Sequence, residues 1–329
     1  MNAPAPQLSR SAAHALSTDL YGWFCVGFSA DLGPGDVQPV TFFGRETVLF
    51  RTASGAPAMV SAHCPHLGAH LGYGGRVVGE HIVCPFHKFE FDARGRCAGT
   101  ACSSKPPHQS DLQPFILVER GGMLLTWHDP LGRSPLFDLP SWELDHHTPL
   151  RGVSTTVASH PQETSENSVD FSHFTHIHNY RDVRIHRPIA VDGPHLTTTY
   201  RMQRPTPGLE RLRLPAEFEV HVWGLGLSIV HIRTGPLRAR LFILSTPSEP
   251  GRVTLRAATQ VRLGAHRGGS RVARMLGDLV NRFVLDGVHH DVEQDRDMWE
   301  HKRFEPRPRV VAGDGPIGRY RQYVRQFYV

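Results

Sequence analysis

The chain has 329 residues, which is long enough for two domains of the usual size of about 100 to 200 residues. Apolar residues make up 40% and charged residues 20%, as in ordinary globular proteins, and no run of about 18 apolar residues could form a transmembrane helix, so we expect a soluble protein. The formal net charge of +5 does not indicate a nucleic-acid partner, because Arg and Lys are spread along the chain without a dense basic run or interleaved aromatic residues.

The beginning of the chain and its cysteines indicate the compartment. Residues 1–19 lack a continuous apolar segment of signal-peptide length, so we expect no export and interpret residues 1–20 as a partly disordered lead-in. Two of the five cysteines belong to a motif described below, and the other three, Cys25, Cys97 and Cys102, do not indicate a disulfide framework because their number is odd. The expected location is therefore the reducing cytoplasm.

The first third of the chain has the pattern of short strands. Apolar or alternating runs, separated by Gly, Pro and Asp, read WFCVGF, VTFFG, ETVLFR, APAMVSA, HIVCPF, KFEFDARG and FILVERGGMLLTWH. These runs predict a small all-β domain over residues 21–130, with a hairpin turn at residues 92–95. Residues 129–149 are rich in Pro, Leu and His and are interpreted as a connector.

Two pairs of metal-ligand residues lie within this domain, in the segment HCPHLGAHLGYGGRVVGEHIVCPFHKFEF at residues 63–91. Cys64 and His66 form a Cys-x-His pair, and after seventeen intervening residues Cys84 and His87 form a Cys-x2-His pair. Two thiolates on one iron and two neutral imidazoles on the other are typical of a Rieske [2Fe-2S] cluster.

A structural zinc site is the alternative, because two Cys and two His also suit tetrahedral zinc. Zinc fingers, however, place both Cys in one pair and both His in the other. Here each pair contains one Cys and one His, which matches a cluster with two unlike irons. The spacing therefore predicts a Rieske [2Fe-2S] centre held by Cys64, His66, Cys84 and His87.

A second motif follows the connector, in the sequence ENSVDFSHFTHIH at residues 166–178. It contains Asn167, Asp170, His173 and His178, and on an ideal helix the two His would lie about 140° apart with Asp170 between them. That angle is too wide for both imidazoles to bind one metal, so we expect a bulge or a helix end before His178. His176 lies off this face and is interpreted as structural.

The motif has two interpretations. Its histidines could be solvated or hydrogen-bonded groups of an amphipathic helix. An electron-transfer cluster, however, needs an acceptor, and a 2-His-1-carboxylate site for non-haem Fe(II) with open positions for O2 is a suitable one. We therefore predict a mononuclear Fe(II) site with His173 and His178 as ligands.

The rest of the chain predicts strands followed by a long helix. Successive antiparallel strands are predicted by the alternation at residues 196–200 and by the runs AEFEVHVWG, LSIVHI, RARLFILSTP and RVTLRAATQVR. Residues 271–304 are predicted to form a helix. The fold class is therefore α+β, with an all-β domain followed by an α+β catalytic domain over residues 131–329 that has a central antiparallel sheet. The run VHVWGLGLSIVHI could line a pocket for an apolar substrate or could be plain strand core.

The long helix offers the third iron ligand. Asp295 falls within the apolar stripe of Val288, Val292 and Trp299, and a carboxylate on a buried stripe needs a cation, most simply a metal. Asp291 lies at the margin of this stripe and is the second candidate.

The two motifs together resemble the Rieske non-haem iron oxygenases, over nearly the whole chain from residue 21. The segment CPHLGAHLGYGGRVVGEHIVCPFHKFEF looks most like the cholesterol 7-desaturases of the Neverland type, and the catalytic-domain motif is similar to that of bacterial 3-ketosteroid 9α-hydroxylase oxygenases. The segments VEQDRDMWEHKRF and DGPIGRYRQYVRQFY resemble the same sterol-acting branch. In that branch the Asp of the EQD triplet, here Asp295, is the third iron ligand.

The resemblance implies an enzyme and its partners. In the family an NAD(P)H-dependent reductase, or a ferredoxin and reductase pair, supplies electrons for an O2-dependent hydroxylation or desaturation of a hydrophobic small molecule. Family members assemble as rings, which implies a homotrimer, and an Asp at the position of Asp170 bridges the cluster of one subunit and the iron of its neighbour. Asp170 could instead only orient His173. Together with Asn167, it completes the set of candidate catalytic residues.

Three functions compete at this point. The first is oxidation of a sterol or steroid, the second is the same chemistry on an aromatic or natural-product scaffold, and the third is a non-catalytic electron carrier, which the second metal motif opposes. Two departures from the family are visible. The animal desaturases carry an N-terminal membrane segment that this chain does not show, and Lys88 and Glu90 stand where relatives often have Gly and Trp.

Overall fold

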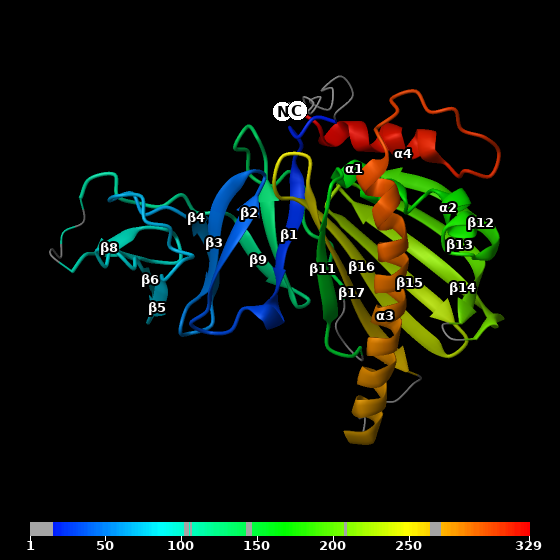
Figure 1. Cartoon of the computed structure of the whole chain (residues 1–329), viewed down its shortest axis with the longest axis horizontal. Coiled ribbons are helices and arrows are strands. Elements are labelled where there is room, and N and C mark those ends of the chain that lie inside the picture. The colour runs from blue at the N-terminus through cyan, green and yellow to red at the C-terminus, as the bar shows by residue number, and fades with distance from the viewer. Residues whose placement is uncertain (1–15, 102–104, 106, 143–146, 207–208, 264–270) are drawn as a thin grey trace, which may run out of the picture.

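The structure is a computed structural model that describes residues 16–101, 105, 107–142, 147–206, 209–263 and 271–329. Within these residues the strands form three small antiparallel sheets, in the orders β1-β10-β9, β2-β3-β4 and β5-β6-β7-β8, and one seven-stranded sheet. Figure 1 shows the small sheets at one end of the molecule and the large sheet at the other. Cys102, one of the three cysteines outside the ligand pairs, lies outside the described residues.

The small sheets come from the first part of the chain, as the sequence predicted. Their strands are β1 (Gly22–Phe28), β2 (Val37–Phe42), β3 (Arg45–Arg51), β4 (Pro57–Ser61), β5 (Arg76–Val78), β6 (His81–Val83), β7 (Glu90–Phe91), β8 (Cys97–Gly99), β9 (Leu117–Arg120) and β10 (Met123–His128), with the short 3-10 helix η2 (Ser29–Asp31). The predicted turn at residues 92–95 joins β7 to β8.

The large sheet has the order β11-β17-β16-β15-β14-β13-β12, and all its neighbouring strands are antiparallel. The strands are β11 (Arg151–Val157), β12 (Arg181–Asp192), β13 (His195–Thr206), β14 (Leu209–Trp223), β15 (Leu227–Thr234), β16 (Leu237–Pro247) and β17 (Val253–Leu263). The helices are α1 (Pro161–Glu166), α2 (Phe171–His176), α3 (Arg271–His301) and α4 (Ile317–Val324), followed by the 3-10 helix η3 (Arg325–Phe327). The predicted α+β class is confirmed, whereas the predicted boundaries at residues 20 and 130 stay predictions.

Two local predictions differ from the structure. Residues 166–178 do not form one helix, because α1 ends at Glu166 and α2 begins only after Asp170. The edge strands β11 and β12 were not predicted, and most residues of β12 are exposed, so this strand lacks the alternating apolar pattern that marks a half-buried strand.

Strand alternation divides the large sheet into two faces with different partners. On one face Leu227 and Ile229 pack with Phe242 and Leu244 against residues of β1 and β10 such as Trp23. On the other face lies the long helix α3, which crosses the sheet (Figure 1). This second face is where the candidate site forms.

The helix α3 is held by apolar side chains on one of its sides. Val288, Val292 and Trp299 are buried against Leu255 and Ala257 of β17. Burying side chains of this kind contributes roughly 1.5–3 kcal/mol each, so this seam fixes both the position and the rotation of the helix. None of the helices in the described residues is long and apolar enough to cross a bilayer.

The contact between the β1 sheet and the large sheet contains buried hydrogen bonds as well as apolar packing. The guanidinium of Arg256 donates to the backbone carbonyls of Cys25 and Val26 at 2.8 and 2.9 Å, and the Thr246 hydroxyl donates to Cys25 at 2.6 Å. Gly226 completes the fit, because a Cβ there would lie 2.4 Å from the Trp23 carbonyl oxygen. These contacts hold the two parts of the chain in one fixed arrangement.

We predict that Gly226→Ala destabilises the protein by roughly 1–3 kcal/mol, because the added methyl group forces β1 away from the large sheet. The measurement is the midpoint of urea-induced unfolding. Gly318→Ala is the matched control, since a Cβ at this helical position meets nothing within 4 Å and should leave the midpoint unchanged or slightly higher. Equal midpoints for wild type and Gly226→Ala would contradict the close packing described here.

Candidate metal centres

The two predicted ligand pairs of the first motif lie on loops with matching backbone geometry. The Cys64 carbonyl accepts a hydrogen bond from the N–H of Gly68, and the Cys84 carbonyl accepts one from Lys88. Both residues that donate have positive φ, +77° for Gly68 and +58° for Lys88. Lys88 therefore adopts a conformation that costs a side-chain-bearing residue roughly 1–2 kcal/mol.

The four side chains divide into a buried pair and a more exposed pair. Cys64 and Cys84 are each only 1% exposed, while the imidazole rings of His66 and His87 lie nearer the surface with their centroids 4.6 Å apart. Burial raises the pKa of the Cys64 thiol to about 11, so a thiolate here needs bound cations to be stable. The donor set of two inner sulfurs and two outer imidazoles fits a [2Fe-2S] cluster. Neither cysteine forms a disulfide.

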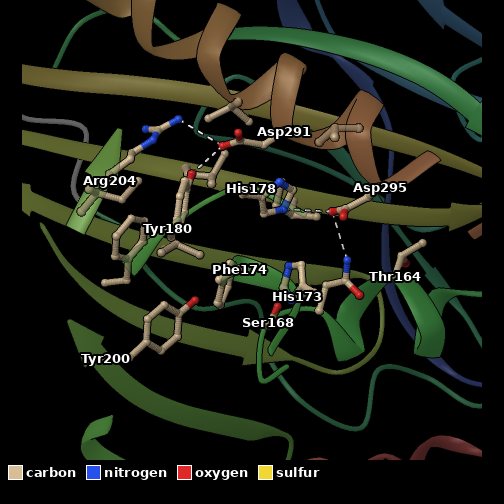
Figure 2. Close-up of a pocket in the computed structure, with 18 of the residues that line it drawn as sticks. Thr164, Ser168, His173, Phe174, His178, Tyr180, Tyr200, Arg204, Asp291 and Asp295 are labelled. Carbon is tan, nitrogen blue, oxygen red and sulfur yellow. Dashed lines mark hydrogen bonds and ion pairs between the residues drawn. The ribbon is translucent and has the colours of Figure 1, made fainter. Parts of the chain in front are cut away.

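The second motif and the helix α3 form a compact metal-ligand set. One donor atom from each of His173, His178 and Asp295 lies within 4.8 Å of the others. His178 Nε2 is 3.5 Å from Asp295 Oδ2, and the two His rings have centroids 5.1 Å apart. Figure 2 shows the two imidazoles and the carboxylate directed toward one another from α2, the turn after it and α3.

Local backbone structure brings the two histidines together. Asp170 caps α2, because its Oδ1 accepts hydrogen bonds from the backbone N–H of Ser172 and of His173. The helix ends at His176, and Asn179 follows with φ of +55°, so the chain turns and places His178 beside His173. The predicted helix end before His178 is confirmed.

Hydrogen bonds orient each side chain of the set. His173 Nδ1 donates to the backbone carbonyl of Asp170 at 2.6 Å, and His178 Nδ1 donates to Gln294 Oε1 at 2.9 Å. Both rings consequently direct Nε2 toward the centre of the set, as metal-binding histidines do. The third side chain, Asp295, accepts a hydrogen bond from Asn167 Nδ2 at 3.1 Å.

The electrostatics of the set also favour a cation. Burial lowers the pKa of His173, which favours a neutral imidazole. Burial also disfavours the charged form of His178, but its contact with Asp295 outweighs this and leaves the pKa raised. Because Asp295 is only 7% exposed, its negative charge needs a partner, and a divalent metal is a stronger one than a shared proton.

Other predicted residues lie around this centre in different ways. Asn167 contacts Asp295, and Asp170 reaches the centre only through His173. His176 is exposed on the surface. Asp291, the second candidate for the carboxylate ligand, is outside the set and accepts hydrogen bonds from Tyr180 and Arg204 instead.

The set lies at one end of a cavity between the large sheet and α3. The wall also contains residues that the sequence analysis did not single out for the site, among them Arg204, Tyr180 and Thr164 (Figure 2). Most of the wall is apolar, and its apolar and aromatic residues are Phe174, Tyr200, Phe218, Val230, Ile232, Leu241, Ile243, Val288, Val292 and Trp299. Val230 and Ile232 belong to the run LSIVHI, so part of that run does line a pocket.

Two family models match successive parts of the chain. Residues 22–116 match the family of the Rieske [2Fe-2S] domain, and residues 126–328 match the family described as 3-Ketosteroid 9alpha-hydroxylase C-terminal domain. Solved structures with similar folds include dicamba monooxygenase bound to dicamba, with a TM-score of 0.67 at 16% identity over 93% of this chain and 96% of the other. Another is NdmA of Pseudomonas putida CBB5 with caffeine, with a TM-score of 0.67 at 19% identity over 92% of this chain and 89% of the other.

Two curated relatives are similar in sequence over almost the whole chain. Cholesterol 7-desaturase nvd of Hemicentrotus pulcherrimus is 34% identical over 93% of this chain and 69% of its own length. The oxygenase component of 3-ketosteroid-9-alpha-monooxygenase of Rhodococcus rhodochrous is 25% identical over 94% and 83%. The chain therefore belongs to the Rieske non-haem iron oxygenases, in the branch of the cholesterol 7-desaturases and 3-ketosteroid 9α-hydroxylases, enzymes whose cofactors are a [2Fe-2S] cluster and a mononuclear iron.

Proposed function

We propose that this chain is the oxygenase component of a system that hydroxylates or desaturates a sterol- or steroid-like substrate with O2 and electrons from an NAD(P)H-dependent reductase. The observation that carries the proposal is the position of His173, His178 and Asp295 at one end of a largely apolar cavity. An apolar wall with few polar groups suits a hydrophobic substrate held close to a metal. The names of the curated relatives support the same substrate class.

The residues present fit both cofactors. His173, His178 and Asp295 would hold the iron, and Cys64, Cys84, His66 and His87 would hold the cluster. When bound, the cluster supplies electrons and the iron supplies oxygen activation. The contribution of the remaining side chains is to position these ligands, because Gln294 and Asn167 fix His178 and Asp295, and the apolar wall excludes water from the substrate.

Arrangement of the chain supports electron transfer between copies, as in the ring of three copies that we propose. The cluster loops lie at one end of the molecule and α2, which carries His173, lies toward the other (Figure 1), and the buried hydrogen bonds of Arg256 oppose a swing that would bring the cluster loops and α2 together. The apolar residues Leu67, Tyr73 and Phe86 are exposed on or near the cluster loops, and the Phe86 ring contacts that of His87, with centroids 3.8 Å apart. Such a surface is suited to dock against the Asp170 region of a second copy, because burying exposed apolar area drives association.

A turnover assay tests the proposed reaction. The holoenzyme is combined with a surrogate reductase and NADH, and offered sterols, 3-ketosteroids, aromatic acids and natural-product ring systems in parallel. Mass spectrometry should show a gain of sixteen or a loss of two mass units in the steroid class. Turnover confined to aromatic or natural-product scaffolds would replace this proposal with the second candidate function, and turnover of none would contradict both.

The cluster assignment gives the first functional prediction. Cys64→Ser and His87→Ala should each abolish the visible absorption of the cluster together with turnover, because each removes a ligand with no neighbour to replace it. Cys25→Ser is the matched control, since Cys25 is equally buried but lies in the β1 sheet, away from the cluster loops. A normal visible spectrum in Cys64→Ser or His87→Ala would refute the assignment.

The iron assignment gives a prediction for the carboxylates near the C-terminal end of α3. Asp295→Ala should lower the iron content to that of the cluster alone, with the visible absorption retained and turnover lost. Asp297→Ala, on the exposed side of the same helix, should change neither. Iron counting and absorption spectra decide the matter, and loss of iron from Asp291→Ala with retention in Asp295→Ala would show that Asp291 is the ligand.

A further prediction concerns the contact between subunits. Asp170 Oδ1 accepts hydrogen bonds from the backbone N–H groups of Ser172 and His173, and the side-chain oxygen of Asn can accept the same bonds. Asp170→Asn should therefore keep α2, both cofactors and the proposed ring of three copies intact. The second oxygen would face the neighbouring cluster, so the variant should slow reoxidation of the pre-reduced cluster by about 10- to 100-fold or more. The measurement is single-turnover reoxidation with substrate and O2, and a wild-type rate would leave Asp170 only the role of orienting His173.

A further inference from the structure

The cavity contains a second polar group besides the iron-binding set. Asp291 lies four residues before Asp295 on α3, and is therefore about 6 Å farther along the helix axis. Its Oδ2 accepts hydrogen bonds from the Tyr180 hydroxyl at 2.7 Å and from Arg204 Nη2 at 3.1 Å. Figure 2 shows these three side chains at one side of the cavity and the histidines at the other.

Within the described residues, the partners of the Arg204 guanidinium leave some of its donors for a ligand. Arginine carries five N–H donors, and Asp291 and the Tyr180 hydroxyl engage only part of them. Arg204 lies in the cavity wall, and its side chain is 21% exposed although the surroundings are mostly apolar. Burial opposes the charged form, but Tyr180 and Asp291 outweigh it and raise the pKa of Arg204, so the group stays a cation.

A purely structural role explains this arrangement less well. Removing an arginine and a carboxylate from water costs several kcal/mol per ion, and apolar side chains of similar volume would join β13 to α3 at lower cost. The helix is already fixed to the sheet by Val288, Val292 and Trp299. An ion pair that lines a ligand cavity and keeps unused donors is therefore suited to contact the ligand itself.

The charges restrict what such a ligand can be. Asp291 already balances Arg204, so the pair is neutral overall, and the carboxylate would repel an anionic ligand. The N–H groups of Arg204 can donate to a ligand, while both hydrogen bonds to Asp291 use Oδ2, so its Oδ1 can accept one. A neutral oxygen that accepts from Arg204, in a ketone or a hydroxyl group, satisfies both conditions.

We propose that Arg204, held in place by Asp291 and Tyr180, binds a neutral oxygen of the substrate, in a ketone or a hydroxyl group on its ring system. The inference rests on the proposed function and deepens it, because it selects neutral, oxygen-bearing polycyclic substrates over hydrocarbons and acids. A substrate held at this oxygen by Arg204 presents a defined carbon to the end of the cavity with His173 and His178. Arg204 is in this sense a specificity-determining residue that also directs the position of oxidation.

A pair of matched ligands tests the proposal. Equilibrium dissociation constants are measured on the holoenzyme for a 3-ketosteroid and for the same steroid without the 3-oxygen. Wild type should bind the ketone about ten- to hundredfold more tightly, which is the range expected for one hydrogen bond to a charged group. Arg204→Met should reduce this ratio to about one, and Arg204→Lys should restore part of it. In turnover, Arg204→Met should raise KM more than it lowers kcat. The variant should also give products that are oxidised at more than one carbon of the substrate.

Two further variants separate ligand binding from stability. Arg204→Met alone leaves Asp291 without its cation and could unfold, so the double variant Arg204→Met/Asp291→Leu removes both charges and should show the same loss of ketone preference. Arg201→Met is the matched control, because Arg201 lies on the same strand and pairs with Glu217 at 2.7 Å, but on the opposite face of the sheet. It should keep the wild-type ratio.

The outcomes distinguish this inference from the proposed function. If wild type binds neither steroid, the substrate class is wrong and the oxygen subsite is wrong with it. If wild type binds both steroids equally, or if the double variant keeps the preference for the 3-ketosteroid, the steroid class stands and only the role of Arg204 is overturned. Preferential binding of an aromatic carboxylate that depends on Arg204 would overturn the neutral ligand and assign the site to an acid.

Discussion

The packing of α3 across the large sheet is the interaction on which both functional ends of the cavity depend. Val288, Val292 and Trp299 determine which side of the helix faces the sheet, and that same side carries Asp295 and Asp291. Successive side chains of an α-helix point about 100° apart around its axis. A shift of one residue in the packing of Val288, Val292 and Trp299 would therefore move both carboxylates out of the cavity. Apolar packing thus sets the geometry of the polar chemistry.

Spacing and periodicity explain what could be predicted from the sequence. The predicted Rieske ligands lie on two short loops, so local spacing was enough to propose them, and the phase of α3 favoured Asp295 as the carboxylate ligand because burial of a helix face is periodic. The alternation in β13 to β17 likewise predicted an antiparallel sheet, which the structure confirms. These features depend on residues that are close in sequence.

Features that depend on distant residues could not be predicted in the same way. Asp291 lies near the buried stripe, so phase alone could not separate a metal ligand from an ion-pair partner, and Arg204 is 87 residues away in the chain. The break between α1 and α2 was missed because Asp170 was treated as part of a helix face, whereas its side chain caps α2. Gln294 stands beside Asp295 in the EQD triplet, but only the folded turn after α2 brings His178 to it.

The long separation between the predicted iron ligands also bears on how the protein matures. His178 is 116 residues before Gln294, the neighbour of Asp295, and between them the chain forms most of the large sheet, so the predicted metal set exists only after that sheet and α3 have assembled. A metal that binds the folded chain and not the unfolded one stabilises the folded state by mass action. Iron bound at this set would therefore raise the yield of folded protein and its resistance to proteolysis, in addition to its part in the reaction.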